Sequence, residues 1–456
     1  MNRIHRFVVL CAGVVLALAS VRAADAAVGV KRVVSPGGIE AWLVEEHSVP
    51  VLALQFAFRG GSGLDPANKR GLAELAMDTL DEGAGDLDSQ AFHTRVRQLG
   101  AQMSFSAGMD NITGGLFVLT ARRDEAARLL NMALAQPRFD ADAVNRVKGQ
   151  ILADLSQAEE NPRRVARETF MRAMFGDQAY AHRTEGTSEG IKAITPDDLH
   201  KFASARLTRD HLLVTAVGDI NEKDLGALLD RTFGTLPTTG TPPDLPDQAV
   251  SSGGRTIVVQ KDIPQSTVVF GEKGLRRDDP DIYAGLVMNY VLGGGGFESR
   301  LTNEVRDKRG LAYYVGTSLV AYDKAGLIEG AVGSVNDKIA ESLSIIRAQW
   351  AKMRDHGATA TEVKDAKSYL TGSYLTGIGS SSALAGTLLG YRLDNRPIDY
   401  LETRNSRIEK VTVADVNRVA KRLLNPDALV FVVVGQPKGV ASTTPAPTPA
   451  SAHPTP

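Results

Sequence analysis

The stretch ITPDDLHKFASARLTRDHLLVTAVG, residues 194–218, returns 217 positions later as VTVADVNRVAKRLLNPDALVFVVVG, residues 411–435. In both copies a threonine precedes apolar residues at helical spacing, and an aspartate follows three positions after that threonine. A strand-like apolar run then ends in glycine. The pattern predicts a capped helix followed by a β-strand, and its recurrence indicates two copies of one structural unit.

The two halves also match weakly at their fronts, at an offset of 211 residues. There Ala73 and Met77 correspond to Ala284 and Met288. Between the halves, residues 237–254 are rich in Pro, Thr and Gly and lack an apolar period, which is typical of a linker. A chain of 456 residues is also long for a single core. The predicted domains are therefore residues 28–236 and 255–438.

Strands and helices mix within each half. We expect strands at Ile39–Glu45, Pro50–Phe58, Ser104–Ala107 and Thr113–Thr120, and helices at Arg70–Leu80 and Ser89–Leu99. The expected order of elements is two strands, helices, two more strands, several helices and a last strand. This order predicts an α+β fold with two homologous domains, each an antiparallel or mixed β-sheet packed against helices.

The composition and the chain ends suggest an exported protein. Residues 1–27 combine the basic Arg3 and Arg6 with a short apolar run and small residues near Ala26, as in a secretory signal peptide; an uncleaved anchor is the alternative. The sole cysteine, Cys11, lies in this segment, so we expect no disulfide and no thiol nucleophile in the mature chain. These features favour a periplasmic location.

Two further expectations follow from composition. The formal net charge of −1 gives no reason to expect nucleic acid or an anionic membrane as a partner, and no later apolar run is long enough to span a bilayer. Residues 439–456 consist mainly of Ser, Thr, Ala and Pro. Such a segment cannot bury enough apolar surface to fold, so we expect a disordered tail.

The stretch Arg59–Asp65, followed by Arg70–Ala73, resembles the approach to the active site of insulinase (pitrilysin-like) zinc peptidases. In that family the next helix carries His-x-x-Glu-His, whose two His bind zinc while the Glu activates water. In length and in its two-domain organisation, this chain resembles the subunits of mitochondrial processing peptidase. The resemblance extends over nearly all of residues 30–435.

The zinc-binding residues are replaced in this chain. Glu74, Met77 and Asp78 occupy the places of the first His, the general base and the second His, and the third ligand, 76 residues further on, falls on Asp154. A carboxylate trio lacks imidazole, and a thioether cannot take a proton from water. Two interpretations of the carboxylates remain: a site for a hard cation, or ordinary solvated and ion-paired side chains. We expect no metal in this chain.

The second half retains a different element of the family. The run LGGGGF at residues 292–297 leads to Arg306 and, seven positions later, Tyr313. This resembles the family's Arg/Tyr pair, which faces the substrate across from the zinc. A guanidinium offers donors to peptide carbonyls, and a phenol can stabilise an oxyanion. We expect a helix over 297–308, a turn at Gly310 and a strand over 311–319 to bring the pair together.

The resemblance implies a division of labour between paired chains. The leading hypothesis is a non-catalytic, substrate-binding subunit of a heterodimeric periplasmic zinc endopeptidase. It supplies Arg306 and Tyr313 to a zinc-bearing homologous partner and holds an unfolded peptide at a sheet edge. The alternative is a peptide-binding or structural protein with no peptidase activity, like the core subunits of respiratory complexes. A self-sufficient hydrolase lacks support, because the mature chain has no cysteine nucleophile and its remaining histidines are scattered.

Overall fold

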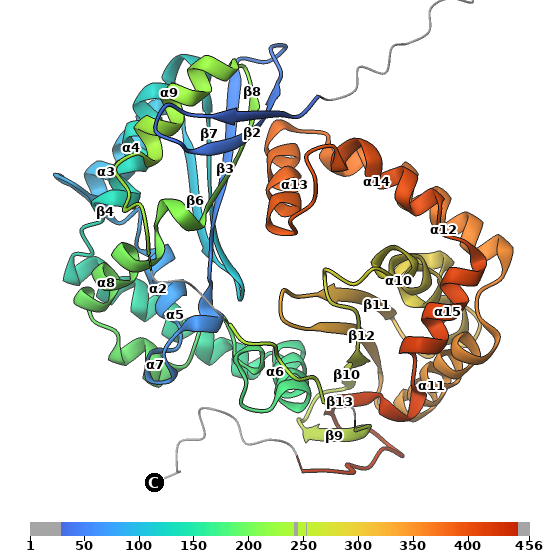
Figure 1. Ribbon diagram of the computed structural model, residues 1–456. Coiled ribbons are helices and arrows are strands. Elements are labelled where there is room, and N and C mark those ends of the chain that lie inside the picture. Colours follow the sequence, from blue (N-terminus) through green and yellow to red (C-terminus); the bar gives the residue numbers. More distant parts are fainter. Residues whose placement is uncertain (1–28, 241–244, 252, 446–456) are drawn as a thin grey trace, which may run out of the picture.

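The computed structural model describes residues 29–240, 245–251 and 253–445, and it contains two large β-sheets that face each other across an open centre (Figure 1). The signal-peptide expectation lies outside the described residues. The first sheet has the order β1-β2-β8-β3-β7-β6 and the second has the order β11-β12-β10-β13-β9. Their strands are β1 Lys31–Val34, β2 Glu40–Glu45, β3 Val51–Arg59, β6 Gln102–Ala107, β7 Asn111–Leu119, β8 Leu212–Gly218, β9 Arg255–Gln260, β10 Gln265–Lys273, β11 Tyr314–Ala321, β12 Gly326–Val335 and β13 Val430–Gly435.

The two sheets share one topology. Read from β2, the first sheet runs β2-β8-β3-β7-β6, and read from β9, the second runs β9-β13-β10-β12-β11. In each, the first pairing is parallel and the other three are antiparallel. This confirms the predicted α+β class with two homologous domains built on mixed sheets.

Helices cover the sheets in both halves (Figure 1). They are α2 Leu72–Asp78, α3 Ser89–Leu99, α4 Arg123–Ala135, α5 Ala141–Glu160, α6 Pro162–Phe175, α7 Ser188–Ala193, α8 Pro196–Arg206, α9 Glu222–Phe233, α10 Ile282–Asn289, α11 Ile339–His356, α12 Ala360–Gly372, α13 Ser381–Leu393, α14 Tyr400–Glu409 and α15 Val413–Leu423. A small hairpin joins β4 Gly83–Ala84 to β5 Leu87–Asp88. The expected strands and helices of the first half all form, with ends shifted by a few residues.

The repeated stretch folds as predicted in both copies. Thr195 caps α8 and Thr412 caps α15, and each forms a reciprocal capping box with the aspartate three residues later. The strands that follow end at Gly218 and Gly435, whose φ angles are 144° and 147°. A side chain is strongly disfavoured at such angles, so the glycine in each copy has a backbone reason.

A second shared detail lies on the facing strands of each sheet. Phe56 of β3 pairs with Gly114 of β7, and Phe270 of β10 pairs with Gly330 of β12. A Cβ at Gly114 or Gly330 would lie 2.2 Å or 2.4 Å from the phenylalanine ring. Each ring therefore occupies the space over its glycine, and this cross-strand packing is the same in the two halves.

Each half sends one helix to the other half's sheet. Helix α6, from the first half, packs on β13 and β10, where its Phe170 and Met174 join a buried cluster with Val432. Helix α13, from the second half, packs on the equivalent β8 and β3, with Leu388 buried there. Figure 1 shows both helices beside the sheet of the opposite half. The two halves are therefore joined by reciprocal apolar packing, not by the linker alone.

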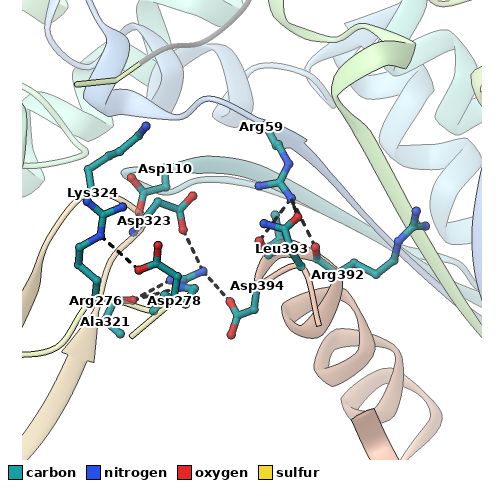
Figure 2. A network of polar contacts seen from close by, with 12 residues as sticks. Arg59, Asp110, Arg276, Asp278, Ala321, Asp323, Lys324, Arg392, Leu393 and Asp394 are labelled. Atoms are coloured by element: carbon teal, nitrogen blue, oxygen red, sulfur yellow. Dashed lines mark hydrogen bonds and ion pairs between the residues drawn. The ribbon is translucent and has the colours of Figure 1, made fainter. Parts of the chain in front are cut away.

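Polar contacts join the halves near these helices (Figure 2). Arg59 of β3 donates to Asn395 Oδ1 at 2.8 Å, and beside this contact Arg277 pairs with Asp394 at 2.7 Å within the second half. Arg392, at the end of α13, donates to the carbonyl oxygen of Val214 in β8 at 2.7 Å. Tyr180 connects the two halves, because its hydroxyl donates to Asp110 at 2.6 Å and accepts from the Lys324 N–H at 3.0 Å.

Two segments expected to lack regular structure make specific contacts. In the linker, Gln248 N–H donates to Lys324 O, and Ser251 N–H donates to Met174 O. Near the C-terminus, Thr443 exchanges hydrogen bonds with Thr256 along the outer edge of β9. Residues 241–244, 252 and 446–456, which belong to the expected linker and tail, lie outside the described residues. Among the helices that the structure describes, none is long and apolar enough to cross a membrane.

Candidate functional site

Helix α2 begins at a turn that fixes its first residues. Gly71 has φ 98°, and a Cβ there would lie 2.6 Å from the Glu185 carbonyl oxygen. The Asp65 carboxylate accepts hydrogen bonds from Gly71 N–H at 3.0 Å and Ala73 N–H at 3.2 Å. Burial nevertheless raises the pKa of Asp65 to about 6. The turn that resembles the family's approach to zinc is thus structurally intact.

The three carboxylates at the former zinc positions lie near one another. Glu74 and Asp78 are one turn apart on α2, and Asp154 lies on α5, which packs against α2. Burial, followed by repulsion from Asp78, raises the pKa of Glu74 to about 7. Burial, with repulsion from Asp81 and Asp154, raises the pKa of Asp78 to about 6. Asp78 therefore lies near enough to repel both Glu74 and Asp154.

Met77 does not face this group of acids as a catalytic residue would. Its side chain is 2% exposed and belongs to the core beneath the first sheet. A thioether in such a place contributes packing and has no proton to exchange. The residue at the family's general-base position is therefore part of the hydrophobic core.

The residues present do not fit the zinc that the family implies. The trio contains no imidazole, and burial raises the pKa of Glu74 and so favours its protonated form, which is a poor zinc ligand. In the described part of the chain, only Asp81, Glu82 and His93 converge closely enough to suggest a metal, with donor atoms within 4.8 Å of one another. Glu82 is already held by Ser89 and Arg146. These residues therefore offer no metal centre of the family's kind.

The second candidate site lies in the other half, where the backbone differs from the regular helix predicted over 297–308. Ser299 is extended, and Thr302–Asp307 forms a π-helical segment with wider turns. The Ser299 hydroxyl accepts from Thr302 N–H and so begins this segment. Irregular helical turns of this kind are frequent at functional sites. Arg306 lies in this segment, and its guanidinium carbon stands 4.9 Å from the centre of the Phe297 ring.

Tyr313 immediately precedes β11, which starts at Tyr314, three residues after the predicted start. The Tyr313 N–H donates to Gly333 O at 2.9 Å, so its backbone is part of the sheet. Its side chain is 59% exposed. The neighbouring Tyr314 lies under the guanidinium of Arg163 on α6, with 4.7 Å between the guanidinium carbon and the ring centre.

Arg306 and Tyr313 thus flank one helix-to-strand connection, with the turn at Gly310 in the left-handed region at φ 58°. Within the described residues no hydrogen bond joins the two side chains, and both are at least partly exposed, so a ligand could contact their polar groups. The sequence did not indicate the stacking of Arg306 on Phe297, or of Arg163 on Tyr314. Neither contact has a sequence signal, because each joins residues from separate elements.

Known proteins resemble this chain over most of its length. Residues 42–188 match the insulinase family (peptidase family M16), and residues 193–370 match the peptidase M16 inactive domain. A non-peptidase homologue of Helicobacter pylori is 29% identical over 86% of this chain and 91% of its own. An uncharacterized zinc protease of Streptomyces coelicolor is 30% identical over 87% of each chain. A crystal structure of a peptidase M16 inactive domain from Pseudomonas fluorescens superposes with a TM-score of 0.84 at 28% identity, covering 92% of this chain and all of that one.

Proposed function

This chain belongs to the insulinase family (peptidase family M16) as a non-catalytic member, and we propose that it is the substrate-binding subunit of a heterodimeric zinc endopeptidase in the periplasm. In this proposal a homologous partner chain carries the zinc and the His-x-x-Glu-His motif. This chain contributes Arg306 and Tyr313 to that site and binds no zinc at its own α2.

One contrast between the halves carries the proposal. At the former general-base position, Met77 is buried in the core, whereas Tyr313 keeps its phenol exposed although its backbone is fixed by the sheet. A rigid backbone with an exposed phenol suits a group that must meet a ligand in a defined geometry. The opposite arrangement at α2 is suited to packing only.

The sheets offer places for an extended peptide. The first sheet ends at β1 and β6, and the second ends at β11 and β9. The outer edge of β9 is already engaged by Ser442 and Thr443. An unfolded peptide could add as a strand to β6 or β11 through main-chain hydrogen bonds, and the first residues of β11 directly follow Tyr313.

The test mixes the purified chain with a homologous chain of the same organism that contains His-x-x-Glu-His. Complex formation is measured by size, zinc by elemental analysis and activity by peptide cleavage. We expect less than one zinc per molecule of this chain alone, no cleavage by it alone, and cleavage by the complex. One tightly held zinc per chain together with cleavage by the isolated chain would contradict the proposal. Peptide binding without any peptidase partner would favour the alternative, a binding protein with no enzymatic role.

A further inference from the structure

A hollow at the junction of the two halves has chemistry that the proposed function does not use. Its volume is about 450 Å³, and it lies between α6, the segment 181–185 and the turns at Met109 and Tyr322. Met109, Met171 and Tyr322 give it an apolar floor, and Arg164, Arg167 and Arg183 line its walls. Sites between domains with an apolar lining and a few charged groups are typical of ligand binding.

Positive charge outweighs negative charge around this hollow. Glu168 is shared between Arg172, at 2.9 Å, and Arg183, so one carboxylate serves two guanidiniums. Arg164 lies 3.5 Å from Glu185, a loose pairing, and Arg167 forms an ion pair with Glu329 of β12. A guanidinium has five N–H donors, and these partners use only some of them.

A further arginine adjoins the hollow without a carboxylate partner. Arg70 lines a second, smaller cavity of about 180 Å³ that shares Met109, His182 and Arg183 with the first. Among the described residues no carboxylate lies within ion-pair distance of Arg70; its guanidinium instead contacts His182 Nδ1 at 2.6 Å. Because a guanidinium can only donate, Nδ1 accepts, and Nε2–H then points toward the Asp177 carbonyl oxygen at 3.3 Å.

Burial and the excess of positive charge lower the pKa values of two nearby groups, His182 and Arg70. Burial lowers the pKa of His182, and repulsion from Arg70 and Arg172 lowers it further. The pKa of Arg70 is lowered by burial and by repulsion from Arg172, and Asp177 offsets only part of this lowering. The geometry and the charges agree that an anion in this hollow would relieve repulsion that the protein alone leaves in place.

We propose that this hollow binds a carboxylate of the peptide substrate, either its C-terminal carboxylate or an Asp or Glu side chain. The planar fork of a guanidinium matches a carboxylate in two parallel hydrogen bonds, and the apolar floor suits the aliphatic or aromatic part of the same residue. A free phosphate or a long basic segment would not use that floor. The inference rests on the proposed function only for the peptide as carrier of the carboxylate.

The place of the hollow supports this role. Glu185, which lines it, is also near enough to Glu74 on α2 to contribute to the raised pKa of that residue. The hollow therefore adjoins the former zinc helix, and Tyr322 brings the β11–β12 hairpin of the other half to its edge. A peptide residue held here would be fixed relative to both halves.

The test measures binding of three unlabelled decapeptides of the same neutral sequence to the purified full chain by calorimetry. The first has a free C-terminal carboxylate, the second is amidated, and the third is amidated and contains one Glu. We expect the first or the third to bind about tenfold tighter than the second, because a charge-assisted pair contributes roughly one such factor. The peptide that binds more tightly than the amidated neutral peptide identifies the source of the carboxylate.

Substitution shows whether the gain comes from this hollow. Arg164→Gln should remove most of the tenfold gain. Arg95→Gln is the matched control, since both arginine side chains are 49% exposed and each pairs with one glutamate. The control should keep the gain. Equal loss in both variants, or equal binding of all three peptides, would overturn the carboxylate site while leaving peptide binding itself intact. Binding of none of the peptides would overturn both this site and the proposed function.

A spectroscopic readout is independent of affinity. The pKa of His182, followed by NMR in the free chain and in the chain saturated with the tighter peptide, should rise on binding, because a nearby carboxylate stabilises the imidazolium. The amidated neutral peptide should leave it unchanged. An unchanged pKa with the carboxylate peptide would place that carboxylate elsewhere and contradict the proposal.

Discussion

Helices α2 and α10 hold equivalent places in the two halves, and they show what duplication preserves. Met77 of α2 and Met288 of α10 correspond in sequence, and both are buried in the cores of their halves. The residues that directly follow these methionines differ: Asp78 is exposed, whereas Asn289 is buried. The apolar positions that hold each helix to its sheet are shared. The position that follows is not shared, because it is exposed in the first half and packed into the interior in the second.

A second comparison concerns the strands under those helices. The shared topology places Phe58 of β3 and Glu272 of β10 at equivalent positions, since they pair with Ile112 and Ile328. Phe58 is buried among apolar residues. Glu272 is buried too, but Trp350 Nε1–H donates to it at 2.6 Å and Asn425 N–H donates at 3.1 Å. The second half thus buries a carboxyl group at the position where the first half buries an aromatic ring.

The largest expected effect concerns the helix that crosses between the halves. Phe170→Ala, on α6, removes a fully buried ring from the cluster that covers the second sheet. We expect the free energy of unfolding to fall by about 3–5 kcal/mol, as for other large-to-small core changes. Phe297→Ala is the control, because that ring is 71% exposed. Denaturant unfolding measures both. A loss below about 1 kcal/mol for Phe170→Ala would mean that α6 does not stabilise the second half.

The second-largest expected effect concerns Tyr313, the exposed tyrosine that the proposed function assigns to the substrate. In the complex with the zinc-bearing partner, Tyr313→Phe should lower kcat by roughly 10²–10³, the usual result of losing one oxyanion donor. Assembly, measured by size, should be unchanged, since the side chain is exposed. Tyr369→Phe is the matched control, at 57% exposure. Wild-type turnover by an assembled Tyr313→Phe complex would show that the phenol is not used.

Much of the fold could be predicted from sequence because its signals are local. Thr195 with Asp198, and Thr412 with Asp415, specify capped helices within four residues, and Gly218 and Gly435 mark strand ends that favour glycine. The exchange of α6 and α13 between the halves could not be predicted in this way. Both helices have ordinary apolar faces, and no pattern within a helix states which sheet it will cover.

The sites were predictable to a lesser degree. Family resemblance located Glu74, Asp78 and Asp154, and the structure places them together; their use stays a prediction, as does that of Arg306 and Tyr313. The predicted helix over 297–308 became a π-helical segment, because Ser299 bonds locally and the adjacent glycines impose no helical preference. The hollow brings Met109, Arg164 and Tyr322 together from three separated segments, a convergence that only the tertiary fold creates.

A pH experiment sharpens the comparison of Phe58 with Glu272. Burial raises the pKa of Glu272 from 4.5 to about 7, so between these values the folded state binds more protons than the unfolded state. Stability therefore falls as pH rises through that window, by about 3 kcal/mol from this group. Glu272→Gln should remove this part of the slope. Denaturant unfolding of both proteins at pH 4.5 and pH 7.5 measures it, and parallel curves would show that Glu272 titrates normally.

Rebuilding the former zinc site separates packing from chemistry in α2. The triple variant Glu74→His, Asp78→His and Asp154→Glu should bind zinc close to one per chain, because two His one turn apart on α2 share a helix face and α5, which carries residue 154, packs against that helix. Adding Met77→Glu places a carboxylate in the core and should cost about 1–3 kcal/mol of stability. Elemental analysis and denaturant unfolding measure the two effects. If the fourth change is harmless, Met77 is not a packing residue.

The smallest expected effect concerns Arg306. Its guanidinium lies over the exposed Phe297 ring, which limits its motion, and in the described part of the chain its N–H groups donate to no other residue, so they can meet a peptide carbonyl. A contact made equally in the bound substrate and the transition state changes KM and not kcat. Arg306→Ala should therefore raise KM of the complex by about tenfold, the equivalent of roughly 1.4 kcal/mol, with kcat nearly unchanged. Arg309→Ala is the control, because that neighbouring guanidinium is bound to Glu304 at 2.6 Å. A fall in kcat with constant KM would instead assign Arg306 to the transition state, together with Tyr313.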